Sequence, residues 1–595
     1  MFYRVQKIII LFICCVASIN AQQKVHSHND YLQKVPFWNA FSAEASSIEV
    51  DVLLKNNTLY VAHSQSDIIE NRTLEGLYLN PLQQALKLGF NDTKNIHLLI
   101  DVKSNAYKTL HKIIEVLKSY PNLTETNKIS FTISGNRPKP SEYKNYPDFI
   151  KFDYQSLENI SIDAWKKVAL ISLDYSKFSK WNGKGRFTKA DKQKIINVIE
   201  AAHKYHKPFR FWGTPDSKTA WKAFSDLGVD FINTDMPFAC YQYVKNFKKR
   251  TYTNSLFSKV YTPTFKNDQK KKPVKNIILL IGDGNGLTQI SAATLANKGA
   301  LTLTQLKSIG LIKTQSSDDF TTDSAAAGTA LATGKKTYNR AIGLDSSEKS
   351  IKNITEILQM HHFNTGIITT DNITGATPSS FYAHQKDRDD ESEIAQDLLK
   401  SKLNLFVGGG KNQFKDFGGF EILKSPKEIG TSKNNKIGFF MSNKGVPGVL
   451  EGRGNLLAEV TLNSLAYFKT KKQPFFLMIE GAQIDSYGHR NDTKGIISEG
   501  IDFDKAITTA IKFADANEGT LVIITADHET SGFSIPQGNL ETHEVEGNFT
   551  TYDHTGALVP VFAYGPHSNE FSGVYENTEI FHKIMNLIKL YKKSK

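Results

Sequence analysis

The stretch TTDSAAAGTALATGKK, residues 321–336, holds one carboxylate, one serine and a run of small residues that ends in two lysines. Its alanines favour a closely packed helix, and the polar pair Asp323–Ser324 stands where that helix would begin. Serine at a helix start is most often an N-cap. The same position also faces unpaired backbone N–H groups and the positive end of the helix dipole, which suits a phosphate. The residues around the stretch must decide between these two roles.

Outward from this stretch, the C-terminal half alternates short apolar runs with helical patterns. Six runs are typical of buried strands: NIILLIGDG (276–284), FNTGIITTD (363–371), LNLFVGGG (403–410), PFFLMIEG (474–481), TLVIITADH (520–528) and VPVFAYG (559–565). This alternation predicts an open, doubly wound and mostly parallel α/β sheet. Such sheets bind their ligands at the carboxyl ends of the strands.

Potential metal ligands follow several of these strands. They are Asp283, Thr377, Glu480, Asp485, His489, Asp527, His528 and His554. The spacing of Asp485 and His489 places both on one face of a helix. A serine hydroxyl needs activation to attack, and no histidine lies near Ser324 in the sequence, so a metal is the expected activator. Of the three cysteines only Cys240 lies outside the first residues, so His, Asp and Glu must supply the ligands.

In their order and spacing, these motifs resemble the alkaline phosphatase family over about residues 276–595. The matching pieces are IGDG, TTDSAAAGTALATGKKTYNRAIG, ATPSSFYAH followed by Arg388, EGAQID followed by His489, TADH, and HTG before FAYGP. Any one of these pieces alone would be weak, whereas all of them in order are specific.

The resemblance implies a nucleophile and three metal sites. Ser324 would attack phosphorus and become phosphoserine, and Arg388 would clamp two phosphate oxygens. One Zn²⁺ would be held by Asp485, His489 and His554. A second Zn²⁺ would be held by Asp283, Asp527 and His528. One Mg²⁺ would be held by Asp283, Thr377 and Glu480. Four carboxylates offset only part of the charge of three divalent ions, which favours the dianion of a phosphate monoester over a diester.

The sequence departs from the best-known bacterial pattern of this family at two positions. Gly375 and Ser486 stand where charged or histidine side chains often lie outside the metal ligands. The region between Arg388 and Glu480 carries no large insertion. The magnesium preference and a homodimer are therefore left open.

The N-terminal half has a different rhythm. Eight β-rich runs follow one another: VHSHND (25–30), SSIEVDV (46–52), HLLIDVK (97–103), KISFTIS (128–134), DFIKFD (148–153), VALISLD (168–174), PFRFWGT (208–214) and VDFINTD (229–235). A further short run, LYVAHS (59–64), lies beside the second. Eight such units in this length predict a parallel (β/α)8 barrel of TIM type, whose chemistry lies where the strands end.

The ends of these runs resemble the glycerophosphodiester phosphodiesterase family and its phosphatidylinositol phospholipase C-like relatives, over about residues 24–240. That pattern is a His, an acidic-x-Asp pair, a second His and an acidic-x-Lys pair. The residues in these places are His28, Glu49, Asp51, His63, Asp101 and Lys103. The resemblance implies that one Ca²⁺ or Mg²⁺ is bound by Glu49, Asp51 and Asp101. It also implies that His28 and His63 act as base and acid while Lys103 neutralises the phosphate.

Two departures keep an alternative open for this half. Asn29 replaces the usual Arg after the first His, and Phe37 follows Pro36 where the family has Glu-Asn-Thr. His26 is an alternative to His28 as the first His. The alternative function is an inactive barrel that binds lipid headgroups or polyanions.

Length, charge and the ends of the chain complete the prediction. At 595 residues the chain is too long for one core, and we expect a signal peptide (1–21), a phosphodiesterase-like barrel (22–244), a basic linker (245–275) and a phosphatase domain (276–595). The apolar run in the first residues is too short to span a bilayer, so we expect export to the periplasm or medium without a stable membrane anchor. A lipid anchor at Cys14 or Cys15 is the weaker option.

The net charge of +13 favours anionic partners. Because the sequence shows no nucleic-acid-binding module, the expected partners are small phosphate monoesters and diesters rather than nucleic acid. We therefore expect an exported, phosphate-scavenging hydrolase in which the barrel cleaves diesters and the second domain cleaves the monoesters. A protein that only binds phosphate at a surface is the alternative from another class.

Overall fold

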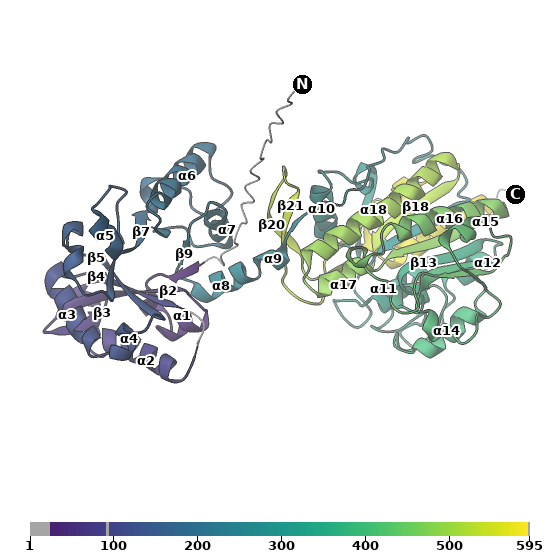
Figure 1. Cartoon of the computed structure of the whole chain (residues 1–595). Coiled ribbons are helices and arrows are strands. Elements are labelled where there is room, and N and C mark those ends of the chain that lie inside the picture. The colour runs from purple at the N-terminus through teal and green to yellow at the C-terminus, as the bar shows by residue number, and fades with distance from the viewer. Residues whose placement is uncertain (1–23, 91–94, 593–595) are drawn as a thin grey trace, which may run out of the picture. The chain divides into compact units, whose positions relative to one another are not determined.

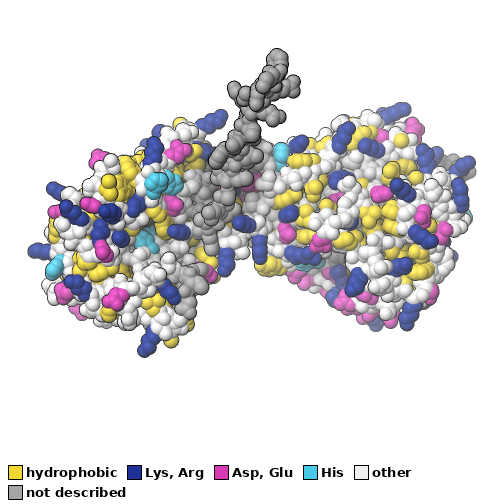
Figure 2. Space-filling model, in the orientation of Figure 1, with side chains coloured by type: hydrophobic (Ala, Val, Ile, Leu, Met, Phe, Trp, Pro, Cys, Tyr) yellow, Lys and Arg dark blue, Asp and Glu magenta, His cyan; other side chains and the backbone are white. Residues whose placement is uncertain are grey.

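The computed structural model describes residues 24–90 and 95–592, so the predicted signal peptide lies outside the described residues. The chain divides into two compact units, the first ending at Phe247 and the second beginning at Lys248 (Figure 1). Across the described residues, no helix combines the length and the apolar composition that crossing a bilayer requires. Lys and Arg side chains are scattered over both units on the face that Figure 2 shows, rather than gathered in one patch.

The first unit is the predicted barrel. Its eight parallel strands are β1 (Lys24–Ser27), β2 (Ser47–Lys55), β4 (Ile96–Val102), β5 (Ile129–Gly135), β6 (Ile150–Tyr154), β7 (Val168–Asp174), β8 (Phe209–Trp212) and β9 (Phe231–Thr234). They pair in the order β1-β9-β8-β7-β6-β5-β4-β2, and pairing of β1 with β2 closes the ring. β3 (Thr58–Val61) adds an antiparallel hairpin to β2. All eight predicted runs are barrel strands.

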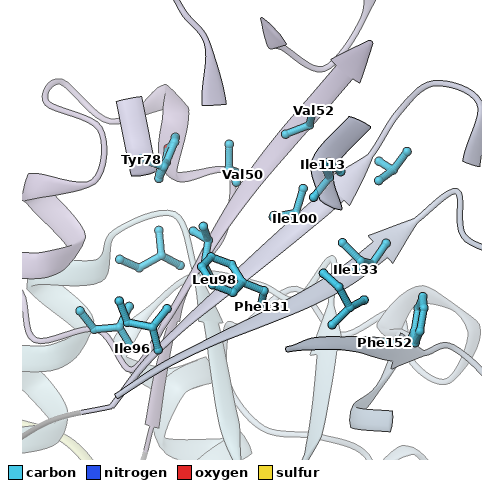
Figure 3. Packing of buried hydrophobic residues seen from close by; sticks show 14 of the residues in the cluster. Val50, Val52, Tyr78, Ile96, Leu98, Ile100, Ile113, Phe131, Ile133 and Phe152 are labelled. Carbon is cyan, nitrogen blue, oxygen red and sulfur yellow. The ribbon is translucent and has the colours of Figure 1, made fainter. Parts of the chain in front are cut away.

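Helices surround this barrel: α1 (Trp38–Ser42), α2 (Asn80–Lys87), α3 (Ala106–Lys118), α4 (Pro121–Thr124), α5 (Ile162–Lys167), α6 (Lys189–His203), α7 (Lys218–Asp226) and α8 (Pro237–Lys245). Alternation along β2 separates two kinds of side chain. Val50 and Val52 pack outward with Ile113 of α3 in the main core (Figure 3). Glu49 and Asp51 therefore face the barrel interior.

The second unit is built on a ten-stranded sheet. Its order is β15 (Glu421–Leu423), β16 (Ile437–Phe440), β14 (Leu405–Gly409), β13 (Asn364–Asn372), β17 (Phe475–Gly481), β11 (Asn276–Gly282), β18 (Thr520–Ala526), β23 (Val559–Tyr564), β12 (Ser308–Lys313) and β24 (Gly573–Glu576). β23 runs antiparallel to β18 and β12, and the remaining pairings are parallel. The doubly wound, mostly parallel sheet is confirmed, and β12, β15, β16 and β24 are strands that the sequence did not predict.

Helices cover both faces of this sheet. The side chains of β11 alternate between the two faces and therefore pack in two separate cores. Ile278 and Leu280 pack with α10 (Leu287–Ala296), α16 (Leu456–Lys471) and α18 (Thr493–Ala516). Ile277 and Leu279 pack with the helices of the other face: α11 (Ser324–Thr333), α12 (Ile354–Gln359), α14 (Glu391–Lys400) and α19 (Thr578–Lys592). Shorter helices are α9 (Phe247–Arg250), α13 (Ala376–Ser379), α15 (Pro426–Thr431) and α17 (Gln483–His489).

Two small sheets lie beside the large one. β10 (Thr251–Thr253) pairs with β21 (Glu544–Asn548), which pairs with β20 (Ser534–Asn539). β19 (Glu529–Thr530) pairs with β22 (His554–Thr555). The segment 251–275, which the sequence places in the linker, is thus held by the second unit. Besides the β10 pairing, the Tyr261 hydroxyl donates to Asp515 at 2.7 Å.

Replacing Gly328 in α11 tests the close packing of this helix. A Cβ at Gly328 would lie 2.8 Å from Ser380 Oγ and 3.4 Å from Thr377 Cα. We expect Gly328→Val to lower the free energy of unfolding by roughly 1–3 kcal/mol, because the added methyl groups push α13 away. Urea denaturation would measure this. Gly445→Ala, with no heavy atom within 4 Å of its Cβ, is the control and should change stability little.

Candidate active sites

Three strand ends meet at the carboxyl edge of the large sheet. Gly282 of β11 is in register with Gly481 of β17 and with Ala526 of β18. Asp283 and Asp527 directly follow two of these residues, and Glu480 directly precedes the third, so the three side chains belong to the same edge. All three carboxylates are buried.

Helix α17 follows β17 directly and brings Asp485 and His489 to the same edge. His489 Nε2 is 3.1 Å from His554 Nε2, and the Asp485 carboxylate lies 3.3 Å from the first and 3.5 Å from the second. The Nδ1 atoms of His489 and His554 face the backbone carbonyls of Tyr552 and Thr322, at 2.5 and 2.8 Å. Because a ring N–H at Nδ1 satisfies each carbonyl, both Nε2 lone pairs are left to face the site.

A second cluster adjoins the first and is centred on His528. Its Nε2 atom lies 3.4 Å from Asp283 Oδ1 and 3.2 Å from Asp527 Oδ2. Ligand atoms of Asp283, Asp485 and His528 lie within 4.8 Å of one another, as do those of Asp485, His489 and His554. Asp485 thus belongs to both clusters.

Ser324 lies at the edge of the His528 cluster. It is the first residue of α11, and its Oγ is 3.2 Å from His528 Nε2. The N-cap is Asp323, whose Oδ1 accepts the Ala326 N–H at 2.9 Å, so the serine hydroxyl is not used as the cap. Asp323 Oδ2 accepts an N–H of Arg388 at 3.1 Å, which brings the guanidinium next to Ser324.

A third set consists of Asp283, Thr377 and Glu480. Glu480 accepts a short hydrogen bond from Thr369. Burial, followed by the charge of Asp371, raises the pKa of Glu480 to about 8. Burial and then Asp527 raise the pKa of Asp283 as well. Carboxylates held this close together repel one another and favour a neutralising cation.

Several buried polar atoms have no hydrogen-bond partner here. They are Asp283 Oδ1, Thr377 Oγ1 and Asp527 Oδ2, and the two carboxylate oxygens have only the ion-pair contact with His528 Nε2. Unsatisfied oxygens at this depth are costly, and all three belong to the residues that the sequence predicted as metal ligands. Imidazole and carboxylate donors suit Zn²⁺, and the oxygen-only third set suits Mg²⁺. The residues present therefore fit divalent ions.

The second unit is similar to known proteins over most of its length. A family model described as Alkaline phosphatase matches residues 274–436, 419–545 and 541–590, more than half of the chain. The chain belongs to the alkaline phosphatase family. Alkaline phosphatase 4 of Bacillus subtilis is 31% identical over 415 residues, covering 54% of this chain and 90% of the relative. The solved alkaline phosphatase of the Antarctic bacterium TAB5 is 44% identical, covers 54% of this chain and 99% of its own, and has a TM-score of 0.51.

This membership makes the chain a phosphoric monoester hydrolase of the alkaline phosphatase family. The structure gathers all predicted phosphatase residues at one edge of the sheet. It adds two that the sequence did not predict, Asp323 and Thr530. Thr530 Oγ1 donates to Asp485 Oδ1 at 2.5 Å and lies 3.2 Å from His528 Nδ1, so it links the two clusters. The position of Thr530, two residues after His528, was the signal in the sequence that could have identified it.

The barrel unit matches two phosphodiesterase models over shorter segments. One, described as AIM6-like phosphodiesterase domain, matches residues 16–97, and the other, described as Glycerophosphoryl diester phosphodiesterase family, matches residues 208–237. These segments contain β1 and β2, whose pairing closes the ring, and β8 and β9, of which β9 pairs with β1.

The predicted barrel residues also converge. Asp51 and Asp101 are in register on β2 and β4. Ligand atoms of Glu49, Asp51 and Asp101 lie within 4.8 Å of one another, and one oxygen each of Asp51 and Asp101 is buried without a hydrogen-bond partner. Lys103 Nζ is 3.1 Å from Asp101 Oδ2 and 3.3 Å from Asp51 Oδ2. Burial, then the charge of Glu49, raises the pKa of Asp101 to about 6, so a cation would stabilise this set.

Both predicted histidines line a cavity of about 560 Å³ beside these carboxylates. His28 Nδ1 forms a 2.7 Å hydrogen bond with Asp235, and His28 Nε2 lies 3.7 Å from Glu49 Oε1. His63 Nδ1 is bonded to Asp51 at 2.7 Å. The alternative, His26, is fully buried between Ser47 and Glu49 and does not line the cavity. Burial and then Arg210 lower its pKa to about 3, so it stays neutral.

Arg210 on β8 is a barrel residue that the sequence did not predict. One of its N–H groups lies 2.7 Å from Glu49 Oε2 and 3.0 Å from Asn233 Oδ1, and the residue lines the same cavity. A charged residue inside the apolar run PFRFW was the available signal. Tyr31 was likewise not predicted, and its hydroxyl donates to Asp51 at 2.9 Å.

Gly135, at the end of β5, tests the position of Asp101. Its φ is +65°, and a Cβ there would lie 1.8 Å from Asp101 Oδ1 and 2.7 Å from the Val102 carbonyl oxygen. We expect Gly135→Ala to lower the free energy of unfolding of the barrel by about 2–4 kcal/mol, since backbone strain and overpacking add. Gly185→Ala is the control, because its φ is +63° but its Cβ meets nothing within 4 Å. Thermal unfolding measures both, and equal losses would contradict the collision with Asp101.

Proposed function

We propose that Ser324 is the nucleophile of a two-step hydrolysis of phosphate monoesters. The observation that carries this is the position of its Oγ, which is not needed as a helix cap and lies 3.2 Å from His528 Nε2, beside Arg388. Attack of Oγ on phosphorus releases the alcohol and leaves phosphoserine. Water then cleaves the phosphoserine and frees inorganic phosphate.

The residues around Ser324 fit two Zn²⁺ and one Mg²⁺, in the sets named above. The TAB5 alkaline phosphatase has been solved, as a variant, with Mg bound in its M3 site, which supports a magnesium ion among the three. Divalent ions held here would lower the pKa of the Ser324 hydroxyl and stabilise the charge on the leaving oxygen.

The protein's own groups orient the phosphate. One N–H of Arg388 donates to Asp323, and this hydrogen bond orients the guanidinium. The remaining N–H groups would then donate to two phosphate oxygens. The first turn of α11 adds backbone N–H groups and the positive end of its dipole. A dianionic monoester matches this positive site better than a diester does.

Ser324→Ala should reduce turnover of p-nitrophenyl phosphate by at least 10³-fold, because no phosphoserine can form. Phosphate release followed by absorbance measures this. The Zn²⁺ content of the variant should stay at the wild-type value, which separates loss of the nucleophile from loss of the site. Ser291→Ala on the exposed side of α10 is the control. Undiminished turnover would contradict the role of Ser324.

We further propose that the barrel cleaves glycerophosphodiester-type diesters and supplies the monoester. Glu49, Asp51 and Asp101 would hold one Ca²⁺ or Mg²⁺, and Lys103 would neutralise the phosphate. His28 and His63 would act as base and acid on either side of it. What supports this is the cavity that His28 and His63 share, with each imidazole oriented by a carboxylate.

A second candidate for the barrel is binding without catalysis, to lipid headgroups or polyanions. One observation favours it, namely that Lys103 and Arg210 pair with the three carboxylates. These two side chains already balance part of the negative charge that a bound cation would otherwise balance. A two-step, phosphate-scavenging role outside the cytoplasm additionally needs export, which residues 1–21 predict.

Glycerophosphocholine separates the two candidates. With Ca²⁺ present, the intact chain should release inorganic phosphate from it, and the Ser324→Ala variant should accumulate the monoester. Asp51→Asn should abolish cleavage of the diester while leaving monoester hydrolysis unchanged. Asp163→Asn, which removes an exposed carboxylate on α5, is the control. An intact diester after incubation with the wild-type chain would leave binding as the barrel's function.

A further inference from the structure

The backbone conformation at position 375 does not require the glycine that is found there. Its φ of −57° and ψ of 163° are open to any residue. A Cβ at this position, however, would lie 2.2 Å from Asp371 Oδ2 and 3.0 Å from Asp371 Cγ. The carboxylate of Asp371 therefore occupies the space in which a side chain at position 375 would begin.

The position of Asp371 follows from the pairing of β13 with β17. Thr369 is in register with Glu480 and donates to its carboxylate, and the Asp371 N–H donates to Thr369 Oγ1 at 2.8 Å. The register of β13 with β14 shifts between Ile368 and Asn372, and within this stretch the Asp371 N–H turns back to the Thr369 side chain. Asp371 is thus held next to the residue that contacts the Glu480 carboxylate.

Charge effects agree with this placement. After burial, Asp371 is the strongest influence that raises the pKa of Glu480. Burial raises the pKa of Asp371 itself, while the charge of Arg388 opposes the increase. Asp371 is therefore close enough to act on both the third metal set and the proposed phosphate clamp.

The proposed magnesium ligands Asp283, Thr377 and Glu480 include oxygens that form no hydrogen bond. Thr377 follows Gly375 by two residues, and its buried Oγ1 has no hydrogen-bond partner. Asp283 Oδ1 is likewise buried without one. These two oxygens belong to the same proposed set as Glu480, and Glu480 is the member on which the charge of Asp371 acts.

We propose that Asp371 is an additional anionic positioning group of the magnesium site formed by Asp283, Thr377 and Glu480, and that Gly375 is the residue that admits it. The inference rests on the proposed metal set. Mg²⁺ keeps several of its waters when protein binds it through few carboxylates. Asp371 accepts hydrogen bonds from those waters and adds a negative charge, and partners of this kind typically change metal affinity 10- to 100-fold.

Binding of Mg²⁺ to the full chain tests this directly. The protein is stripped with a chelator, reloaded with two equivalents of Zn²⁺, and titrated with MgCl2 in a calorimeter. Asp371→Asn keeps the shape and removes the charge, and it should raise the Kd for Mg²⁺ at least tenfold. Glu393→Gln, an exposed carboxylate on α14, is the matched control and should leave the Kd unchanged.

Gly375→Ala gives a second test that does not alter Asp371. Its methyl group should displace the Asp371 carboxylate and raise the Kd as Asp371→Asn does. In an Asp371→Gly background the same Gly375→Ala change should have a much smaller effect, because only the Asn372 carbonyl oxygen, 3.0 Å from the added Cβ, is still close to it. Additive losses in the double variant would contradict the shared space. If Asp371→Asn does not fold, as judged by the thermal midpoint of the Zn²⁺ form, the Gly375→Ala comparison decides.

Glu480→Gln separates this inference from the proposed metal set. It should abolish Mg²⁺ binding if the set is right. A Kd for Asp371→Asn within twofold of the wild type, alongside loss of binding in Glu480→Gln, would overturn the role of Asp371 and leave the proposed function standing. Unchanged binding in Glu480→Gln would overturn the metal set itself.

Discussion

Repulsion among buried carboxylates is the constraint on which the phosphatase unit depends. Asp283, Glu480 and Asp527 are brought together because β17, β11 and β18 are parallel and in register, so their carboxyl ends meet at one edge. Asp485 joins them from α17. Like charges at this depth stay ionised only beside positive charge. The histidines, Arg388 and the proposed divalent ions supply this positive charge. The small residues of α11 allow Ser324 to lie close to these groups.

The barrel meets a similar requirement with fewer groups. Three carboxylates converge at its strand ends, and two protein cations, Lys103 and Arg210, already contact them. Histidines whose rings are oriented by Asp235 and Asp51 border the adjacent cavity. Both units thus place anionic side chains where parallel strands end and surround them with groups that attract phosphate. This shared arrangement suits both the monoester chemistry of the second unit and the diester chemistry proposed for the barrel.

Local patterns predicted most of the architecture. Alternation along SSIEVDV already placed Glu49 and Asp51 on one side of a strand, and the apolar runs of the second half mark its central strands. Strands at and near the ends of the large sheet were missed, among them β12, β15 and β24. β15 and β24 have only three and four residues, and every second residue of β12 is not buried. Burial on the sheet also depends on neighbours that are distant in the sequence.

The sequence by itself determined which residue types are available, their spacing within each motif, and hence the two-unit organisation and the kinds of ligand. Tertiary structure decided which His faces the barrel cavity, that Arg210 contacts Glu49, and that the carboxylate of Asp371 occupies the space beside Gly375. The physical reason is that these relations join different strands or loops. They depend on strand register and on the direction of each side chain, which spacing along one segment does not specify.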